Sequence, residues 1–224
     1  MKRDAPPPTW HRWPRRTEAG ATRGQLPLAV KLLFTLFVCV LVPVYWIHIG
    51  PSNLFWICDI ALIATVVALW TGHRLLTGAI ALAVLLPDLV WNLDFFTRLL
   101  TGVDVLGLDA TGYMFDSATP IWLRALSLFH VFSPLLLWWM LWRLGYDRRA
   151  LFVTTVAWWS LLPATRWLTD PEKNINWAFG IGSPPWMPLP DGLYVAAAML
   201  AFPLVVFLPT HLVLMLVFVR RRRA

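Results

Sequence analysis

The sequence predicts an all-α integral membrane protein, and three observations lead to that fold class. Only 14% of the 224 residues are charged, whereas a soluble domain carries about a quarter. Hydrophobic residues make up 58% of the chain. They occur in long runs rather than at the spacing of an amphipathic helix or strand, so we expect lipid to surround most of the chain.

Six apolar segments each approach the ~20 residues that a helix needs to cross ~30 Å of hydrocarbon. They cover residues 28–49, 53–70, 75–92, 121–142, 150–168 and 192–219. Pro203 and Pro209 interrupt the last segment, so we expect it to be tilted or kinked. We predict a six-helix transmembrane domain over residues 26–219, between a basic tail (1–25) and a basic end (220–224).

The loops between these segments separate into two sets, one rich in basic residues and the other rich in acidic residues. If the N-terminus is cytoplasmic, the inner side receives the tail, Arg74, Arg143, Arg148, Arg149 and the run 220–223. The opposite side receives mostly acidic residues, namely Asp94, Asp104, Asp109, Asp116, Asp170, Glu172 and Asp191. Short loops rich in Lys and Arg stay in the cytoplasm. We therefore predict six spans, with both termini cytoplasmic, in a plasma membrane or bacterial inner membrane.

The remaining composition excludes several classes of partner and cofactor. The tail, with its basic residues and Pro6 to Pro8, cannot bury enough apolar surface to fold alone, so we expect it to be disordered. The net charge of +7 does not form a basic face interleaved with aromatics, so we expect no nucleic-acid partner. Cys39 and Cys58 both fall in apolar runs and form no disulfide or metal pattern. We expect neither a metal nor a cofactor.

Two long loops are predicted on the outer face. Apolar residues in the 93–120 loop are too scattered to span a membrane, so we expect a re-entrant or interfacial segment there. The 169–191 loop is rich in Asn, Pro and Trp and is expected to fold over the same face.

Most ionisable residues inside the predicted spans share one depth. With a rise of ~1.5 Å per residue, the outer half receives Asp59, Asp88, Arg124, His130 and Arg166, together with Cys58. A carboxylate inside a membrane is costly, which favours a functional site, and the common depth favours one outward-facing cavity. The alternative is that Asp88 pairs with Arg124 or Arg166, and Asp59 with His130, only to hold helices together.

If the cavity is catalytic, Cys58 is the candidate nucleophile. An unassisted thiol titrates near ~8.5, so it needs a base, and His130 is the candidate. Asp59 or Asp88 would orient the imidazole, and Asn53 or Asn176 would donate to an oxyanion. The remaining candidate binding residues are Arg124, Arg166 and Asn174. Alternatively, Cys58 packs as a small hydrophobe, and His130 only links helices through a hydrogen bond.

Three short motifs resemble those of a known group of membrane proteins. They are Cys58-Asp59-Ile60-Ala61-Leu62, Leu128-Phe129-His130, and Asn176-Trp177-Ala178-Phe179 followed by Pro184-Pro185-Trp186. Together they resemble the YwaF-like integral membrane proteins and the androgen-induced-gene-1-like membrane hydrolases and acyltransferases. They are similar, too, to bacterial membrane-associated proteins of unassigned function.

The resemblance implies a nucleophile at Cys58, a base at His130 and a lipid acyl ester as substrate. The chain departs from the pattern in two places. Trp56-Ile57 stands where a His often precedes the Cys, and Asn-Trp-Ala-Phe replaces Asn-Tyr-Met-Phe.

The sequence leaves three classes of function open. The first is an enzyme, hydrolase or acyltransferase, acting on lipid acyl esters at the outer leaflet through Cys58 and His130. The second is a proton- or cation-coupled transporter or channel that uses Asp59, Asp88 and His130 as a relay. The third is a non-catalytic subunit of a larger membrane complex. Expected partners are membrane lipid and either another membrane protein or further copies of the chain.

Overall fold

A computed structural model describes residues 26–104, 107–187 and 189–219. Within these ranges every regular element is helical, apart from a single β-bridge between Ile181 and Trp186. The long elements are α1 (Leu28–His48), α2 (Ile57–Thr71), α3 (Arg74–Thr101), α5 (Phe129–Leu144), α6 (Ala150–Leu168) and α7 (Asp191–Phe202). The short ones are η4 (Pro51–Phe55), η5 (Gly112–Met114), α4 (Ile121–Leu126), η6 (Pro171–Lys173), η7 (Ile175–Trp177), η8 (Pro203–Phe207), α8 (Leu208–Leu214) and η9 (Met215–Val219). The predicted all-α class is confirmed, whereas the predicted tail 1–25 and end 220–224 lie outside the described residues.

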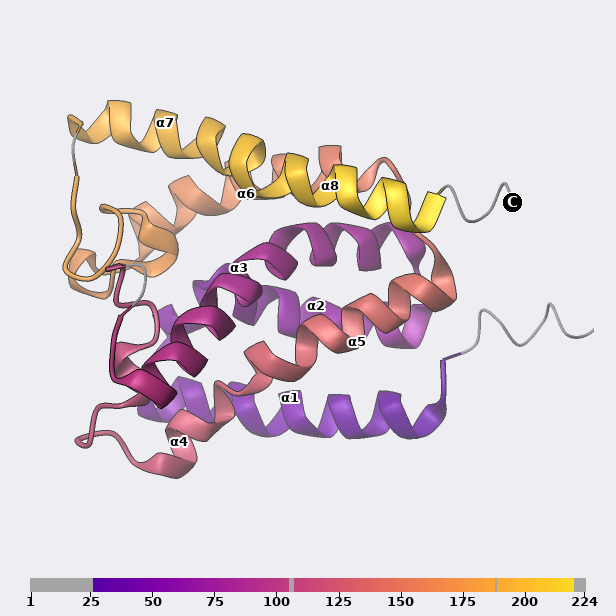
Figure 1. Ribbon diagram of the computed structural model, residues 1–224, viewed down its shortest axis with the longest axis horizontal. Coiled ribbons are helices and arrows are strands. Elements are labelled where there is room, and N and C mark those ends of the chain that lie inside the picture. The colour runs from indigo at the N-terminus through magenta and orange to yellow at the C-terminus, as the bar shows by residue number, and fades with distance from the viewer. Residues whose placement is uncertain (1–25, 105–106, 188, 220–224) are drawn as a thin grey trace, which may run out of the picture.

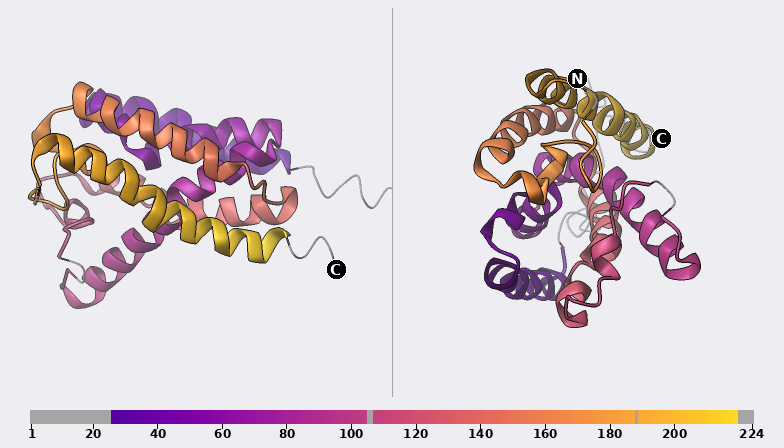
Figure 2. Two further views of the ribbon diagram at one scale, coloured as in Figure 1. Left: turned by 90° about the horizontal axis from the view of Figure 1, so that it is seen from above. Right: turned by 90° about the vertical axis from the view of Figure 1, so that its left-hand side faces the viewer.

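The helices lie roughly along the long axis, and successive long helices run in alternating directions (Figures 1 and 2). The described parts of the connections, residues 49–56, 107–120 and 169–187, gather at one end, which we call the loop end (Figure 1, left). The start of α1, the turns at 72–73 and 145–149, and the end of α8 gather at the other, which we call the terminal end.

Four helices among the described residues are long and apolar enough to cross a membrane. They are Leu28–His48, Arg74–Thr101, the α4–α5 segment Ile121–Leu144, and the α7–α8 segment Asp191–Phe218. α2 is apolar but shorter, with 15 residues, and α6 is interrupted by polar side chains such as Thr154 and Ser160. The chain is a helical membrane protein by these criteria.

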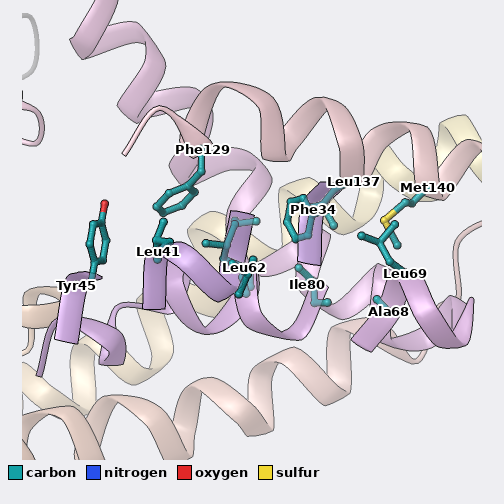
Figure 3. Close-up of a cluster of buried hydrophobic side chains, with 14 of the residues drawn as sticks. Phe34, Leu41, Tyr45, Leu62, Ala68, Leu69, Ile80, Phe129, Leu137 and Met140 are labelled. Atoms are coloured by element: carbon teal, nitrogen blue, oxygen red, sulfur yellow. The ribbon is translucent and has the colours of Figure 1, made fainter. Parts of the chain in front are cut away.

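α3 lies at the centre of the bundle and packs against α2, α5, α6 and α8. Figure 3 shows the main cluster of buried side chains, in which Leu41, Leu62, Leu69, Leu137 and Met140 interdigitate. Long side chains also cover the outside of the bundle. Leu33, for example, is 69% exposed. Such exposed leucines suit contact with lipid, where tight packing between helices rather than water exclusion stabilises the bundle.

α2 starts later than the sequence predicts. The backbone turns at Gly50, whose φ of +101° is a conformation that glycine adopts without strain, and Pro51–Phe55 then form a short 3₁₀ helix. The helix therefore begins at Ile57 rather than near residue 53. This shift places Cys58 and Asp59 in the first turn of α2, where backbone N–H groups lack partners within the helix.

α3 ends later than predicted, at Thr101 instead of residue 92. The apolar residues of the 93–120 loop that suggested a re-entrant or interfacial segment, such as Phe95, Phe96 and Leu99, instead extend α3. Gly102, with φ of +75°, terminates the helix in the left-handed conformation typical of such ends.

The predicted span at 121–142 is broken in two. α4 ends at Leu126 and α5 begins at Phe129, with tighter bonds from His130 N to Ser127 O (3.1 Å) and from Val131 N to Leu128 O (2.9 Å) across the break. Irregular backbone inside a membrane is tolerated only where it is buried in protein or faces a cavity. The break lies immediately before His130.

The last predicted span, expected to be tilted or kinked, departs from α-helical geometry at its first proline. The five residues from Pro203 form a π turn, in which Leu208 N donates to Pro203 O. A second π turn follows at Met215–Val219. Both wide turns are local departures from the α-helix that leave the two halves of the segment roughly continuous (Figure 1).

Candidate functional site

A buried carboxylate and an imidazole form the centre of the site. Asp88 Oδ1 and His130 Nδ1 lie 2.7 Å apart, and the two residues are 2% and 8% exposed. Asp88 follows Pro87 within α3, and His130 lies in the first turn of α5. A carboxylate bonded to Nδ1 fixes the imidazole orientation and leaves Nε2 for other chemistry. Nε2 makes no hydrogen bond to any residue that the structure describes.

Aromatic rings hold the imidazole on both sides. The His130 ring stacks on Phe129 (centroids 4.1 Å apart) and on Trp91 (4.7 Å). Trp91 is fixed in turn, because its Nε1 donates to the Tyr113 hydroxyl at 3.2 Å. Asn92 adds a bridge between helices, since its Nδ2 donates to both the Asp88 and the His130 carbonyls at 2.7 Å. These contacts give the imidazole a defined plane.

Asn176 anchors the start of α2 next to this pair. Its Oδ1 accepts from Ile57 N (2.8 Å), while its Nδ2 donates to Phe55 O (2.8 Å) and Thr165 Oγ1 (3.0 Å). Both amide protons are therefore used, so in this structure the Asn176 side chain offers no donor to an oxyanion. The backbone N–H groups of Cys58 and Asp59 have no carbonyl acceptor among the described residues, and both instead interact with the Cys58 sulfur.

Asp59 is 3% exposed, and no cation of the described chain pairs with its carboxyl group. Its Oδ2 accepts one long hydrogen bond, from Asn53 Nδ2 at 3.3 Å. Its Oδ1 is buried and has no partner among these residues. Such a group in a native structure calls for an explanation, such as an unseen water, an ion or a ligand.

Three hydroxyl groups from different parts of the chain, those of Tyr45, Tyr113 and Ser127, lie close to one another. Tyr45 OH and Ser127 Oγ are 2.8 Å apart, and Tyr45 lies within electrostatic range of Asp59, Cys58 and Tyr113. Burial raises the pKa of the Tyr113 phenol, and hydrogen bonds with Ser127 and Trp91 oppose that rise. Cys58 and Asp59 raise the pKa of Tyr113 further, because both lie within electrostatic range of its phenol.

Cys58 is partly buried at the edge of the core cluster and lies within electrostatic range of Asp59 and Asp88. No hydrogen bond joins its sulfur to His130 in the described part of the chain. The other cysteine, Cys39, is exposed on α1. The structure thus brings together Cys58, Asp59, Asp88 and His130, as the common depth predicted, but leaves the thiol and the imidazole unconnected.

Arg124 and Arg166 do not join the acidic residues of the site. Arg124 Nη1 donates to Met114 O at 2.6 Å. Arg166 pairs with Asp191 (2.6 Å) and donates to Ala178 O (2.8 Å). The helix-linking pairs considered from the sequence, Asp88 with either arginine and Asp59 with His130, are therefore not the ones observed.

Asn174 shapes the 169–191 loop. Its Nδ2 donates to the carbonyls of Gly180 and Gly182 at 2.9 and 3.0 Å, and its Oδ1 accepts from Phe179 N. Lys173 ties the same loop to the end of α1 through Ile49 O and Ser52 Oγ. Of the predicted binding residues, Arg124, Arg166 and Asn174 thus hold the connections at the loop end, whereas Asn53 and Asn176 contact the start of α2.

A shallow groove of about 470 Å³ follows the exposed face of α3 beside the site. Its lining is Leu89, Asn92, Leu93, Phe96, Thr97, Leu100 and Thr101. Asn92 belongs to both regions, because the same side chain bonds the carbonyls of Asp88 and His130. The groove therefore reaches the backbone that carries the Asp88–His130 pair.

Sequence reasoning missed five residues of the site, namely Tyr45, Trp91, Asn92, Tyr113 and Ser127. Helical spacing could have found three of them. Trp91 and Asn92 follow Asp88 by three and four positions, and Ser127 precedes His130 by three, which is the spacing of neighbours on one helix face. Tyr45 and Tyr113 carry no such signal, because only the packing of α1 and of the loop after α3 brings them in.

The described residues contain no group of three or more His, Cys, Asp or Glu side chains placed to hold a metal ion. Comparison with family models, with curated proteins and with solved structures finds no match to this chain.

Proposed function

We propose that this chain is a polytopic membrane enzyme that transfers or hydrolyses the acyl group of lipid esters. The observation that carries the proposal is the buried Asp88–His130 pair, which leaves His130 Nε2 without a partner in the described chain. This is the arrangement of a general base held by a carboxylate. The resemblance of the Cys58-Asp59 and Phe129-His130 motifs to membrane hydrolases supports the same class.

Cys58 is the proposed nucleophile. In the first step its thiol proton passes to His130 Nε2 while the sulfur attacks the ester carbonyl carbon. The carbonyl electron pair moves onto oxygen, then returns as the carbon–oxygen ester bond breaks. His130 gives its proton to the leaving alcohol, and the acyl group remains on Cys58 as a thioester. Because thiol and imidazole are not hydrogen-bonded here, the sulfur must approach Nε2 when substrate binds.

The second step releases the acyl group. Water, or an acceptor alcohol in a transferase, gives its proton to His130 Nε2 and attacks the thioester carbon. The carbon–sulfur bond breaks, and sulfur takes the proton back from His130. In both steps the positive end of α2, at which Cys58 lies, would stabilise the oxyanion.

The groove along α3 suits the acyl chain of such a substrate. Leu89, Leu93, Phe96 and Leu100 form a continuous apolar stripe on its exposed face. The stripe passes Asn92, which bonds the His130 carbonyl. An acyl chain lying there would bring its ester close to the pair without leaving the membrane.

The same proposal includes six spans with both termini in the cytoplasm. The alternating helix directions in Figure 1 and the arginines at the terminal end, such as Arg74 and Arg149, support it. Membrane-impermeant thiol labelling of single cysteines introduced at residues 118 and 148 tests it. Labelling from outside only at 118 is expected, and external labelling at 148 would contradict the orientation.

Covalent labelling tests the enzyme proposal directly. An electrophilic probe with a long alkyl chain should label the wild-type protein, and Cys58→Ala should abolish that labelling. His130→Ala should slow it severalfold, because the thiolate would lose its base. Cys39→Ala is the matched control and should label normally. Equal labelling of Cys58→Ala and the wild type would exclude Cys58 as nucleophile.

A second function, a proton or cation relay, is favoured by one observation. Asp59 is a buried carboxylate whose Oδ1 has no partner in the described chain, as expected for a group that binds and releases a cation. The two functions predict opposite effects of substituting Cys58 and Asp59. A relay tolerates Cys58→Ala but not Asp59→Asn, measured as proton or cation flux into liposomes, whereas the enzyme loses ester turnover with Cys58→Ala.

A further inference from the structure

We propose that the loop segment 111–115, which contains η5, regulates the site by holding the His130 imidazole in its plane, with Tyr113 as the positioning residue. The proposal rests on the proposed function in one respect, namely that His130 is the base whose orientation matters. It adds to the site a part of the chain that lies outside α2, α3 and α5, the helices that carry Cys58, Asp88 and His130.

A chain of five aromatic rings leads from this segment to the imidazole and past it. Phe115 lies against Phe95, with centroids 5.7 Å apart and planes inclined by 31°. Phe95 stacks on Trp91 (5.0 Å, 18°), which stacks in turn on His130 (4.7 Å, 22°). Phe129 completes the chain at 4.1 Å from the imidazole. The plane of the imidazole therefore depends on ring contacts that begin in the loop after α3.

Tyr113 contacts the same group of residues through hydrogen bonds. Its hydroxyl accepts from Trp91 Nε1 at 3.2 Å and also bonds Ser127. Ser127 is joined to His130 directly, because its carbonyl accepts from His130 N at 3.1 Å. Trp91 and Ser127 are 7% and 6% exposed, whereas Tyr113 is 44% exposed. A partly exposed side chain thus holds two buried neighbours of the imidazole.

Hydrogen bonds to two helices keep the segment in place. Thr111 donates to Asp94 Oδ2 of α3 from its backbone N (3.0 Å) and from its Oγ1 (2.6 Å). On the other side, Met114 O accepts from Arg124 Nη1 of α4 at 2.6 Å. A segment held mainly by hydrogen bonds opens at a lower free energy than packed helices do. Opening removes the bond to Trp91 and the ring contact of Phe115.

The position of the segment therefore decides whether the base is correctly aimed. While it is closed, the imidazole is held between two rings and Nε2 keeps one direction. A catalytic group misplaced by about 1 Å can cost about a hundredfold in rate. The segment thus couples the loop end to the chemistry of His130, and the site is active only while the segment is closed.

Ester turnover by the full-length chain in micelles tests the positioning role. Tyr113→Phe keeps the ring but removes both hydrogen bonds of the hydroxyl, so kcat should fall about tenfold while KM stays within about twofold. Adding Trp91→Phe, which removes only the N–H partner of that hydroxyl, should then lower kcat by less than about twofold further, because both changes break one bond. Wild-type kcat in Tyr113→Phe, or independent losses in the double variant, would overturn the proposal.

A second variant acts on the segment without changing the ring chain. Arg124→Met releases Met114 from α4, so kcat should again fall severalfold with little change in KM. Tyr146→Phe is the matched control, because it removes a phenol–imidazole bond to His211 at the terminal end and should leave kcat within about twofold. Wild-type turnover in Arg124→Met, or an equal loss in Tyr146→Phe, would show that the segment does not regulate the base.

Reaction with diethyl pyrocarbonate, which modifies an accessible neutral imidazole, separates this proposal from the enzyme proposal. Mass spectrometry follows His130 against the exposed His73 of the same molecule, and Tyr113→Phe should speed modification of His130 severalfold without changing His73. If protection of His130 depends on Tyr113 but no ester is turned over, the positioning role stands and the enzyme proposal fails. If turnover depends on Cys58 and His130 but Tyr113→Phe changes neither kcat nor protection, the enzyme proposal stands and the positioning role fails.

Discussion

The two ends of the bundle use similar residues and treat them differently. At the terminal end, Tyr146 OH lies 2.6 Å from His211 Nδ1, and Asp147 contacts Arg74 (3.4 Å) and Arg149 (3.0 Å). At the loop end, His130 has Asp88, but Asp59 has no cation in the described chain.

The difference is between a polar cluster whose groups are satisfied within the chain and one whose groups are not. Hydrogen bonds and ion pairs satisfy the terminal-end groups, and Gly78 lets Tyr146 and Ala150 pack closely against α3. That cluster joins helices. The loop-end cluster keeps a buried carboxylate oxygen and one imidazole nitrogen unused by the described residues, at a cost in stability that a ligand would offset.

The largest expected effect is the loss of ester turnover when an aspartate at the loop end, rather than at the terminal end, is replaced. Asp88→Asn should lower ester turnover by about three to four orders of magnitude, because the imidazole loses the anion that orients it and stabilises its protonated form. Asp147→Asn, the matched change at the terminal end, should alter turnover less than about twofold. Steady-state hydrolysis of a lipid ester in micelles measures both, and equal losses would remove the functional distinction.

A smaller effect is expected on stability at the loop end. Asn176→Ala removes three hydrogen bonds that hold the start of α2, and at about 1 kcal/mol each this should lower the free energy of unfolding by about 2–3 kcal/mol. Thermal unfolding in detergent measures the loss. Asn53→Ala, which removes one long bond, is the control and should cost less than half as much.

Filling the groove should change substrate length preference. Leu93→Trp places a larger ring on the exposed stripe of α3, so turnover of long-chain esters should fall severalfold while that of short-chain esters stays within about twofold. Comparing butanoyl and hexadecanoyl esters measures the change. Leu33→Trp on the exposed face of α1 is the control, and the same loss there would show that the groove is not used.

The smallest expected effect is on how the stability of the protein depends on pH, through Asp147 at the terminal end. The hydrogen bond from Arg149 lowers the pKa of Asp147 to about 2, below its unfolded value near ~3.9. The unfolded chain then binds more protons, so this contribution to stability is complete above about pH 4 and is lost as the pH falls towards 2. Asp147→Asn should flatten the dependence of unfolding temperature on pH in that window, by a small amount since Arg149 is exposed. An unchanged profile would show that the pair contributes nothing.

The fold class could be predicted because lipid imposes long apolar runs, and the start of α1 and the bounds of α6 follow from them. The start of α2 could not, because Asn53 and Leu54 are as compatible with a helix as with the 3₁₀ turn that Pro51 initiates. Nor could the end of α3, because Leu93 to Leu100 are too interspersed with Asp94 and Arg98 to be taken for a span.

For the site, depth predicted which residues share a space but not which of them bond. Asp59 and Asp88 were equivalent candidates to orient His130, and only the packing of α3 against α5 selects Asp88. The role of Asn176 in holding α2 likewise depends on a loop that returns to the bundle 119 positions later in the chain.

The shortness of α2 has a consequence for the membrane itself. Its 15 residues extend only about 22 Å, less than the ~30 Å hydrocarbon thickness. Such hydrophobic mismatch is relieved by thinning of the adjacent bilayer. Headgroups and water would then descend beside α2 towards Cys58, so the protein would create its own local supply of the water that the proposed hydrolysis consumes.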